Sequence, residues 1–352
     1  MQPIVTVLTT VYNGLPYLKE AIEGTLNQTF KDFEFLIIDD ASPDEKVIEC
    51  IKSFEDPRIK FVRNEKNLGV SETINKALSI IQTPYVVRSD QDDVSLPNRV
   101  REQIDYLESH PEISILCSWE HTIDSEGRRG RDWKRKIRNY GEFLGPTLLG
   151  ICPIWHPSIA FRTDALIDVG GFNATYVRAE DFEVTTRLAL KRHGGAIIPK
   201  FHLLQRQHNQ SQSKEFEHEQ AKMSQRIQRE AIGEFMNISD AEQLSGFLRL
   251  EKDTSNNLVN KQHIISMHDL LMQMFENVAN KQELSSDEFR TLKKTIFTRV
   301  GLGVYFIPVY KYLPSFLFMP LFYLLSPLFS NSVHKKLSRI YNAMHELKNR
   351  IK

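Results

Sequence analysis

Three carboxylates lie within four residues at Asp90-Gln91-Asp92-Asp93, directly after a short apolar run at residues 85–88. Carboxylate oxygens are hard ligands that suit Mg²⁺ or Mn²⁺, and Mg²⁺ is usually held by one or two carboxylates together with substrate phosphates. The cluster therefore predicts a metal ion that bridges the protein and a diphosphate, where it would neutralise charge on the departing group. The alternative is an acidic turn that caps a following helix.

The first part of the chain alternates short apolar, β-branched segments with segments of helical spacing. The expected strands cover residues 4–9, 33–38, 59–63 and 85–88, and the expected helices cover residues 16–28, 44–54 and 69–81. This alternation predicts a mostly parallel sheet with helices on both faces, in which ligands bind beyond the carboxyl ends of the strands. Those ends are polar or contain glycine, so we expect them to converge on one site; they lie at residues 9–10, 39–40, 64–69 and 89–93.

The rest of the chain is less regular. Short strands are expected at residues 113–117 and 158–161. Residues 124–139 are strongly basic and are expected to form an exposed loop or flap. Residues 214–299 have a polar helical pattern without clear strands, and an apolar block follows at residues 300–329. The sequence therefore predicts a sheet-forming part followed by a helical part.

In their order and spacing these motifs resemble those of family 2 glycosyltransferases, which have the GT-A fold. The resemblance covers about residues 3–212. It rests on residues 5–13, Gln28-Thr29-Phe30, Asp39-Asp40-Ala41-Ser42, residues 64–69, Asp90-Gln91-Asp92-Asp93, His156-Pro157, Gly170-Gly171-Phe172 and Glu180-Asp181. It implies an α/β fold with a Rossmann-like, mostly parallel sheet flanked by helices, followed by an α-helical C-terminal region. We expect a catalytic domain at residues 1–212, a helical accessory region at 213–299 and an apolar, basic tail at 300–352.

The resemblance places the nucleotide of a nucleotide-sugar donor across the ends of the first strands. It assigns donor binding to Thr10, Tyr12, Asn13, Asp40, Asn67, Gly69 and Asp90. Asp40 would accept a hydrogen bond from the base, which favours uracil because the imide N–H of uracil can donate to a carboxylate. Asp92 and Asp90 would hold Mn²⁺ or Mg²⁺, with His208 as a further candidate ligand. Asn67-Leu68-Gly69 also fits an ordinary turn before a helix.

The acidic pair Glu180-Asp181 precedes a segment with helical spacing at residues 181–192. An inverting sugar transfer needs a base that takes the proton of the acceptor hydroxyl as its oxygen attacks the anomeric carbon. The resemblance assigns this role to Asp181, with Glu180 beside it, and the alternative is that both acids cap the helix. His156 and Arg206 are expected to contact the acceptor and the diphosphate, although a merely packed histidine is equally compatible with the sequence.

The segment Gln205-Arg206-Gln207-His208 lacks the tryptophan of the QxxRW motif of processive members, so addition of a single sugar is expected. The expected reaction moves one sugar from a nucleotide-diphosphate sugar, with UDP favoured, to a saccharide or lipid-linked saccharide acceptor, with inversion. Such reactions build bacterial polysaccharides and glycans. The alternatives are a nucleotidyltransferase of related fold and an inactive protein that binds sugar nucleotides. The former should carry a glycine-rich, basic phosphate loop after the first strand, and residues 10–14 do not form one.

The composition indicates a globular protein of the cytoplasm. Lys+Arg and Asp+Glu both total 45, so the formal net charge is zero and nucleic acid is not an expected partner. The three cysteines are widely spaced, and the N-terminus lacks the features of a secretory signal. The apolar tail is interrupted by prolines, so we expect a peripheral contact with the inner face of the cytoplasmic membrane through residues 300–340. A buried helical hairpin or an oligomer contact is the alternative.

Overall fold

The computed structural model describes residues 3–207, 216–249 and 261–300. Its strands are β1 Val5–Val11, β2 Phe33–Asp39, β3 Ile59–Arg63, β4 Tyr85–Arg88, β5 Val94–Ser95, β6 Ile113–Ile123, β7 Arg129–Trp133, β8 Ala160–Arg162 and β9 Gly194–Arg206. Its helices are α1 Leu18–Leu26, α2 Glu45–Lys52, α3 Val70–Ile80, α4 Arg99–Ser109, α5 Tyr140–Leu148, the 3-10 helix η1 His156–Ser158, α6 Thr163–Asp168, α7 Glu180–Leu190, α9 Glu217–Gly233, α10 Ile238–Arg249, α11 Lys261–Lys281 and α12 Ser286–Val300. Within the described residues the strands form one sheet in the order β3-β2-β1-β4-β8-β6-β9-β5, and β7 pairs with β6.

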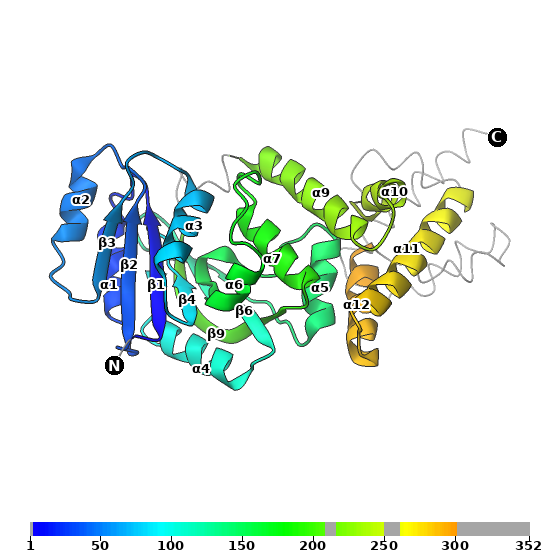
Figure 1. Cartoon of the computed structure of the whole chain (residues 1–352), viewed down its shortest axis with the longest axis horizontal. Coiled ribbons are helices and arrows are strands. Elements are labelled where there is room, and N and C mark those ends of the chain that lie inside the picture. The colour runs from blue at the N-terminus through cyan, green and yellow to red at the C-terminus, as the bar shows by residue number, and fades with distance from the viewer. Residues whose placement is uncertain (1–2, 208–215, 250–260, 301–352) are drawn as a thin grey trace.

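The N-terminal half of the sheet is parallel, as the alternation of segments predicts. β1 pairs with β2 and β4, and β2 pairs with β3. Alternate residues of each strand point to opposite faces. On one face Val7 and Phe35 pack into a core with α1, α2 and α4, and on the other Leu8 and Leu36 pack into a core with α3. The expected mixed α/β fold with helices on both faces is confirmed, and this half of the molecule lies at one end in Figure 1.

The C-terminal half of the sheet is larger than the sequence predicts. β6 runs to Ile123, well past the strand expected at residues 113–117, and it pairs in parallel with β9. β9 is not among the expected strands, because Pro199 and Lys200 lie exposed in its middle and interrupt the apolar pattern. The strand expected at residues 158–161 is shorter, since η1 occupies its first part.

The basic segment at residues 124–139, expected as an exposed loop or flap, is a largely exposed hairpin arm that contains a strand. Within it β7 pairs with β6, with Glu120 opposite Trp133 and His121 opposite Asp132. All five residues of β7 are exposed. A strand with no buried face has no apolar alternation to reveal it, which explains why the sequence pattern does not predict one.

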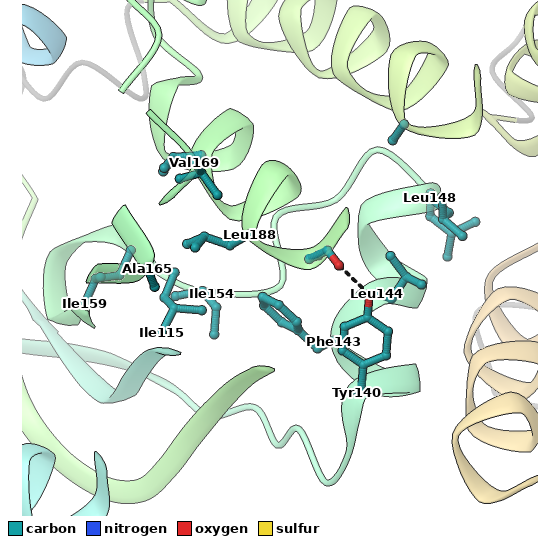
Figure 2. Packing of buried hydrophobic residues seen from close by; sticks show 14 of the residues in the cluster. Ile115, Tyr140, Phe143, Leu144, Leu148, Ile154, Ile159, Ala165, Val169 and Leu188 are labelled. Atoms are coloured by element: carbon teal, nitrogen blue, oxygen red, sulfur yellow. Dashed lines mark hydrogen bonds between the residues drawn. The ribbon is translucent and has the colours of Figure 1, made fainter. Parts of the chain in front are cut away.

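The C-terminal helices share a hydrophobic core with the sheet-forming part. As expected, residues 216–249 and 261–300 are helical and contain no strand. Phe143 and Leu144 of α5 belong to the same buried cluster as Ile232, Phe275 and Leu292 from α9, α11 and α12. Figure 2 shows the part of this cluster around α5, where the Tyr140 hydroxyl donates to the Ala189 carbonyl. The boundary expected near residue 212 therefore does not separate two cores.

Helix α12 approaches α5 so closely that glycine is required between them. A Cβ atom on Gly141 would overlap the backbone carbonyl of Glu288, and one on Gly145 would lie 2.9 Å from Cγ2 of Thr295. The contact is reinforced by polar groups, because the Thr291 hydroxyl donates to Oδ1 of Asn139 at 2.7 Å. Small residues at this helix pair allow the C-terminal helices to lie against the sheet-forming part.

Gly141→Ala is expected to lower the free energy of unfolding by about 1–3 kcal/mol, the usual cost of overpacking, because the backbone of α12 must move. Gly246→Ala is the matched control, since nothing lies within 4 Å of a Cβ in the middle of α10. That substitution should instead stabilise the protein by roughly 0.5–1 kcal/mol through helix propensity. Urea unfolding of the two variants measures both effects, and equal midpoints would contradict the close packing of α5 on α12.

No helix among the described residues is long and apolar enough to cross a membrane. The contact expected through residues 300–340 falls outside them, apart from Val300 at the end of α12.

Candidate active site

Asp90 lies in the acid loop, residues 89–93, at the carboxyl end of β4. Its Oδ1 accepts a hydrogen bond from Nη2 of Arg88 at 2.8 Å, and Nδ1 of His156 lies 4.0 Å from its Oδ2. Burial alone would raise the pKa of Asp90, but the charges of Arg88 and His156 outweigh burial and the pKa is lowered. Asp90 is therefore ionised at neutral pH, and His156 is its neighbour on one side.

Gln91 joins the acid loop to the loop after β1. Its Oε1 accepts from the backbone N–H of Tyr12 at 2.8 Å, and its Nε2 donates to the carbonyl of Tyr12 at 3.1 Å. Asn13 has a left-handed backbone with φ of 54°, and its N–H donates to Oγ of Ser42 at 3.0 Å. The phenol of Tyr12 stays 44% exposed. The loop of Tyr12 and Asn13, which follows Thr10 on β1, is thus held against the acid loop with an exposed aromatic ring.

Asp40 is buried directly after β2 and organises the loop at residues 64–69. Its oxygens accept from Nδ2 of Asn64 at 2.7 Å and from the backbone N–H of Gly69 at 2.9 Å. Oδ1 of Asn67 also accepts from Gly69, at 3.1 Å, and Gly69 has φ of 82°, a conformation that favours glycine. Asp40 therefore fixes the shape of the loop that carries Asn67 and Gly69, and its contact with a base stays a prediction.

The last two acids of the acid loop have different surroundings. Asp93 is buried, and its Oδ1 accepts the backbone N–H of Arg206 at 2.7 Å. Burial, together with the charge of Asp92, raises the pKa of Asp93 well above its usual value. Asp92 is only half-buried, so it is the acid of this pair that can face a ligand.

Arg206, expected to grip a diphosphate, instead fastens the acid loop to β9. Its side chain is only 2% exposed. Nε donates to the carbonyl of Asp92 at 3.1 Å, Nη1 donates to the carbonyl of Asp124 at 3.1 Å, and Nη2 pairs with the carboxylate of Glu20. The guanidinium also stacks on Tyr17, 4.5 Å from the ring centre. Every nitrogen of the guanidinium has a protein partner, so the role of Arg206 is structural in this arrangement.

A second arginine, Arg99, is fully buried below the acid loop. Its Nη2 donates to the carbonyls of Arg88 and Pro157, and its Nη1 donates to Oγ of Ser95 at 2.9 Å. Burial lowers the pKa of Arg99 to about 10, so the guanidinium is still charged at neutral pH. The buried carboxyl of Glu120 is the largest opposing influence, and burial raises its own pKa to about 7.

The Gln28-Thr29 segment of the sequence motif has a structural role beside Arg99. Gln28 is buried; its Nε2 donates to the carbonyl of Leu96 at 2.8 Å, and its Oε1 accepts from the N–H of Val100 at 3.0 Å. Thr29 N–H donates to the carbonyl of Pro97 at 2.8 Å. The segment after α1 therefore holds the chain between β5 and α4, and does not itself face a ligand.

Asp181 lies in the first turn of α7, and a network of glycines and amides fixes the start of that helix. Asn75 of α3 makes two hydrogen bonds of 2.8 Å with the backbone of Phe172, and Arg187 of α7 donates to the carbonyl of Gly171 at 2.7 Å. Oδ1 of Asp181 accepts the N–H of Phe182 at 2.8 Å, and the N-cap residue Ala179 gives no side-chain cap. Asp181 therefore satisfies one N–H of the first turn of α7, and its role as a base stays a prediction.

The segment at residues 152–156 links the two acidic centres. At one end His156 lies beside Asp90. At the other end burial raises the pKa of the Cys152 thiol well above its usual value, and the negative charge of Asp181 adds to that effect. Nε2 of His156 is buried and has no hydrogen-bond partner among the described residues. Asp90 and Asp181, remote in sequence, thus flank one short segment.

Several predicted site residues are brought together, and others are not. The acid loop contacts Tyr12 through Gln91 and His156 through Asp90, whereas Asn13 bonds to Ser42 and His208 falls outside the described residues. Within residues 3–207, 216–249 and 261–300, no three His, Cys, Asp or Glu side chains gather so as to hold a metal ion by themselves. Sequence reasoning missed Arg88 and Arg99; a basic residue at the end of an apolar strand was the available signal for Arg88.

Comparison with known proteins identifies the family to which the chain belongs. Residues 6–170 match the model of glycosyl transferase family 2. A glycosyltransferase of Methanocaldococcus jannaschii is 33% identical over 206 residues, which cover 57% of this chain and 69% of that protein. The chain belongs to glycosyl transferase family 2. A putative glycosyltransferase of Bacillus subtilis, EpsE, is 29% identical to the transferase over 189 residues, which cover 53% of it and 66% of EpsE.

The fold of the transferase also matches solved structures. The Staphylococcus aureus protein TarS, residues 1–349 in complex with UDP-GlcNAc, superposes with a TM-score of 0.55 at 17% identity, over 84% of this chain and 91% of that one. At this identity the likeness concerns the fold. The predicted GT-A fold is thereby confirmed, and the transferase is an enzyme of that class.

Arg99→Met in the transferase is expected to lower the free energy of unfolding by about 3–5 kcal/mol, because it leaves a buried acid uncompensated and several buried carbonyls unpaired. Arg101→Met is the matched control. It lies on the same helix, but Arg101 is exposed and only stacks on Phe30, so its loss should cost less than about 1 kcal/mol. Denaturant unfolding compares the two, and similar losses would contradict the role given to Arg99.

Proposed function

We propose that the transferase moves a single sugar from a nucleotide-diphosphate sugar, with UDP favoured, to a hydroxyl of a saccharide or lipid-linked saccharide with inversion. In this step the acceptor oxygen bonds to the anomeric carbon while the bond from that carbon to the diphosphate breaks. The electron pair leaves with the nucleoside diphosphate, and the hydroxyl proton passes to a base. The observation that carries the proposal is that one short segment reaches both acids. His156 lies 4.0 Å from Asp90, and Cys152 packs against the cluster of Ala179 and Phe182, next to Asp181 in sequence.

The proposed donor site uses the loops that follow β1, β2 and β3. Tyr12 offers an exposed ring beside the acid loop, and Asn67 and Gly69 offer a loop whose backbone a nucleoside can approach. The carboxylate of Asp40 accepts three hydrogen bonds, from Asn64, Leu68 and Gly69. A carboxylate has about four acceptor positions, so one remains for the imide N–H of uracil. The binding of UDP-GlcNAc and of UDP by TarS is consistent with such a donor.

We propose Asp92 and Asp90 as the residues that hold Mg²⁺ or Mn²⁺ together with the donor diphosphate. Both offer hard carboxylate oxygens at a strand end, and Arg88 helps to keep Asp90 ionised, which fits such an ion. When bound, the ion would supply positive charge to the departing diphosphate. The expected contribution of His208 to this ion remains part of the proposal.

Asp92→Asn is expected to abolish the stabilisation of the protein by Mn²⁺ plus UDP, because a ligand to the ion is lost. Asp93→Asn is the matched control. The raised pKa of Asp93 shows that its neutral form is favoured, and an amide oxygen can still accept the N–H of Arg206. Thermal unfolding with and without Mn²⁺ and UDP measures both. Equal losses in the two variants would contradict the assignment of Asp92.

We propose Asp181 as the base that takes the acceptor proton, because its carboxylate is half-buried in the first turn of α7, where Oδ1 accepts the N–H of Phe182 and Oδ2 is the oxygen offered to the acceptor. Asp181→Asn should lower kcat by roughly 10²–10⁴-fold, the range for loss of a general base, with the Kd of the donor unchanged. Glu180→Gln is the control on the neighbouring residue and should retain most activity. Turnover of Asp181→Asn near that of the wild type would refute the assignment.

The two alternatives predict different products. A nucleotidyltransferase would release pyrophosphate from a nucleoside triphosphate and a sugar phosphate but would leave a nucleotide sugar intact, and an inactive binding protein would release nothing from either. Incubation with a panel of nucleotide sugars, with and without Mn²⁺, should instead release the nucleoside diphosphate. The residues between β1 and α1 do not form a glycine-rich basic phosphate loop, which favours sugar transfer.

We also propose that residues 300–340 bring the transferase to the inner face of the cytoplasmic membrane, where a lipid-linked acceptor would lie. The sequence of this tail is apolar and is followed by basic residues, which favour anionic headgroups. The full-length protein should sediment with anionic vesicles, and a chain ending at residue 299 should not. Sedimentation of the shortened chain would contradict the proposal.

A further inference from the structure

A strongly basic surface among the described residues is the basic hairpin, residues 124–138, which contains β7. It carries seven basic residues against three acidic ones, although the whole chain has a net charge of zero. The basic residues are Arg128, Arg129, Arg131, Lys134, Arg135, Lys136 and Arg138, and all seven are exposed. The acidic ones are Asp124, Glu126 and Asp132. An excess of four positive charges on one exposed arm is a feature that the proposed transfer of sugar does not itself require.

Part of this charge is neutralised within the hairpin and part is not. Arg128 pairs with two acids, and Arg129 and Lys134 both pair with Asp132. Arg131 and Lys136, by contrast, have no acidic partner within the described residues. Those two side chains are therefore free to meet an anion from outside.

Tryptophans accompany the unpaired cations. Trp133, at the end of β7, is 39% exposed and lies edge-to-face against Trp155, with ring centres 5.4 Å apart. The guanidinium of Arg135 stacks on the other tryptophan, 5.1 Å from its ring centre. A large aromatic face partly open to solvent can cover the C–H face of a sugar ring, which a purely ionic surface cannot do.

The hairpin is joined directly to the reacting centre. Nη1 of Arg135 donates to the carbonyl of Cys152 at 3.0 Å, and Trp155 immediately precedes His156. Nδ1 of His156 lies 4.0 Å from Asp90. The basic hairpin therefore contacts the segment at residues 152–156. The other end of that segment lies beside the acid loop. A ligand that packs on Trp133 and Trp155 would therefore lie next to His156 and close to the proposed site of transfer.

We propose that the basic hairpin binds the acceptor, and that the acceptor is an anionic saccharide whose phosphate or carboxylate groups contact Arg131 and Lys136 while a sugar ring packs on Trp133. The inference rests on the proposed function, since it names the acceptor class of that same site. The tryptophans favour a saccharide over a bare lipid headgroup, and the continuity with His156 favours a substrate over an unrelated polyanion.

The test uses the full-length protein and fluorescent oligosaccharides of matched length: maltohexaose as the neutral probe and hexagalacturonate and a phosphorylated mannohexaose as the anionic probes. Both anionic probes should bind more tightly than maltohexaose at low salt. Removing two exposed ionic contacts in Arg131→Gln/Lys136→Gln should weaken anionic binding by about two- to fivefold for each charge. The control Lys52→Gln/Lys294→Gln removes two exposed lysines on α2 and α12 and should leave the Kd unchanged.

Trp133→Ala tests the contribution of stacking separately from that of charge. It should weaken all three probes by a similar factor, because stacking does not depend on the charge of the ligand. Donor binding, measured from thermal stabilisation by UDP with Mn²⁺, should be the same in every hairpin variant. A wild-type protein that binds the anionic probes but not UDP with Mn²⁺ would overturn the proposed donor and, with it, the assignment of the saccharide as an acceptor.

Two results would overturn the inference. One is binding of the anionic probes no tighter than that of maltohexaose, which includes absence of binding by all three. The other is a double variant that keeps its affinity for the anionic saccharides but loses affinity for phosphatidylglycerol vesicles or single-stranded DNA. In that case the hairpin would be a membrane or nucleic-acid surface rather than an acceptor site.

Discussion

The guanidinium of Arg99 is buried beneath the acid loop and joins three chain segments that are far apart in sequence. It reaches the carbonyl of Arg88 at the end of β4, the hydroxyl of Ser95 in β5 and the carbonyl of Pro157 in η1. A buried cation is costly unless its donors are satisfied, so these groups are held where the guanidinium needs them. Since Pro157 follows His156 and Arg88 pairs with Asp90, the same cation also fixes the spacing of the site.

The acid loop and the loop after β1 are held together by hydrogen bonds. Gln91 bonds the backbone of Tyr12 as a neighbouring strand would, and Arg206 and Asp93 attach the opposite side of the acid loop to β9. Such preorganisation is valuable for a transferase, because groups that are already in position need not be ordered when the donor binds. The basic hairpin has the opposite character, since every residue of β7 is exposed and the hairpin is attached along one edge, where β7 pairs with β6, and through Arg135.

The sequence predicts well where periodicity reflects burial. β1, β2 and β4 are buried on both faces and read as continuous apolar runs, so the parallel half of the sheet and the strand-end position of Asp90 follow from the pattern. The apolar pattern does not predict β7 and β9, because their exposed residues interrupt it. The role of Arg206 cannot be predicted from the sequence for another reason. An arginine that binds phosphate and one that binds carbonyl groups look the same in a sequence, and only the burial of the side chain distinguishes them.

The hydrogen bond between Asp93 and Arg206 joins residues 113 positions apart, and this separation affects how the chain folds while it is being synthesised. At about 5–20 residues per second, the acid loop is made roughly 6–23 s before the strand that anchors it. During that interval β1, β2, β3 and β4 can pair with one another, but β6 has no β9 beside it. The core around α5 stays open still longer, until α12 emerges. The nascent transferase therefore exposes an apolar surface late in synthesis, which is where a chaperone would be expected to bind.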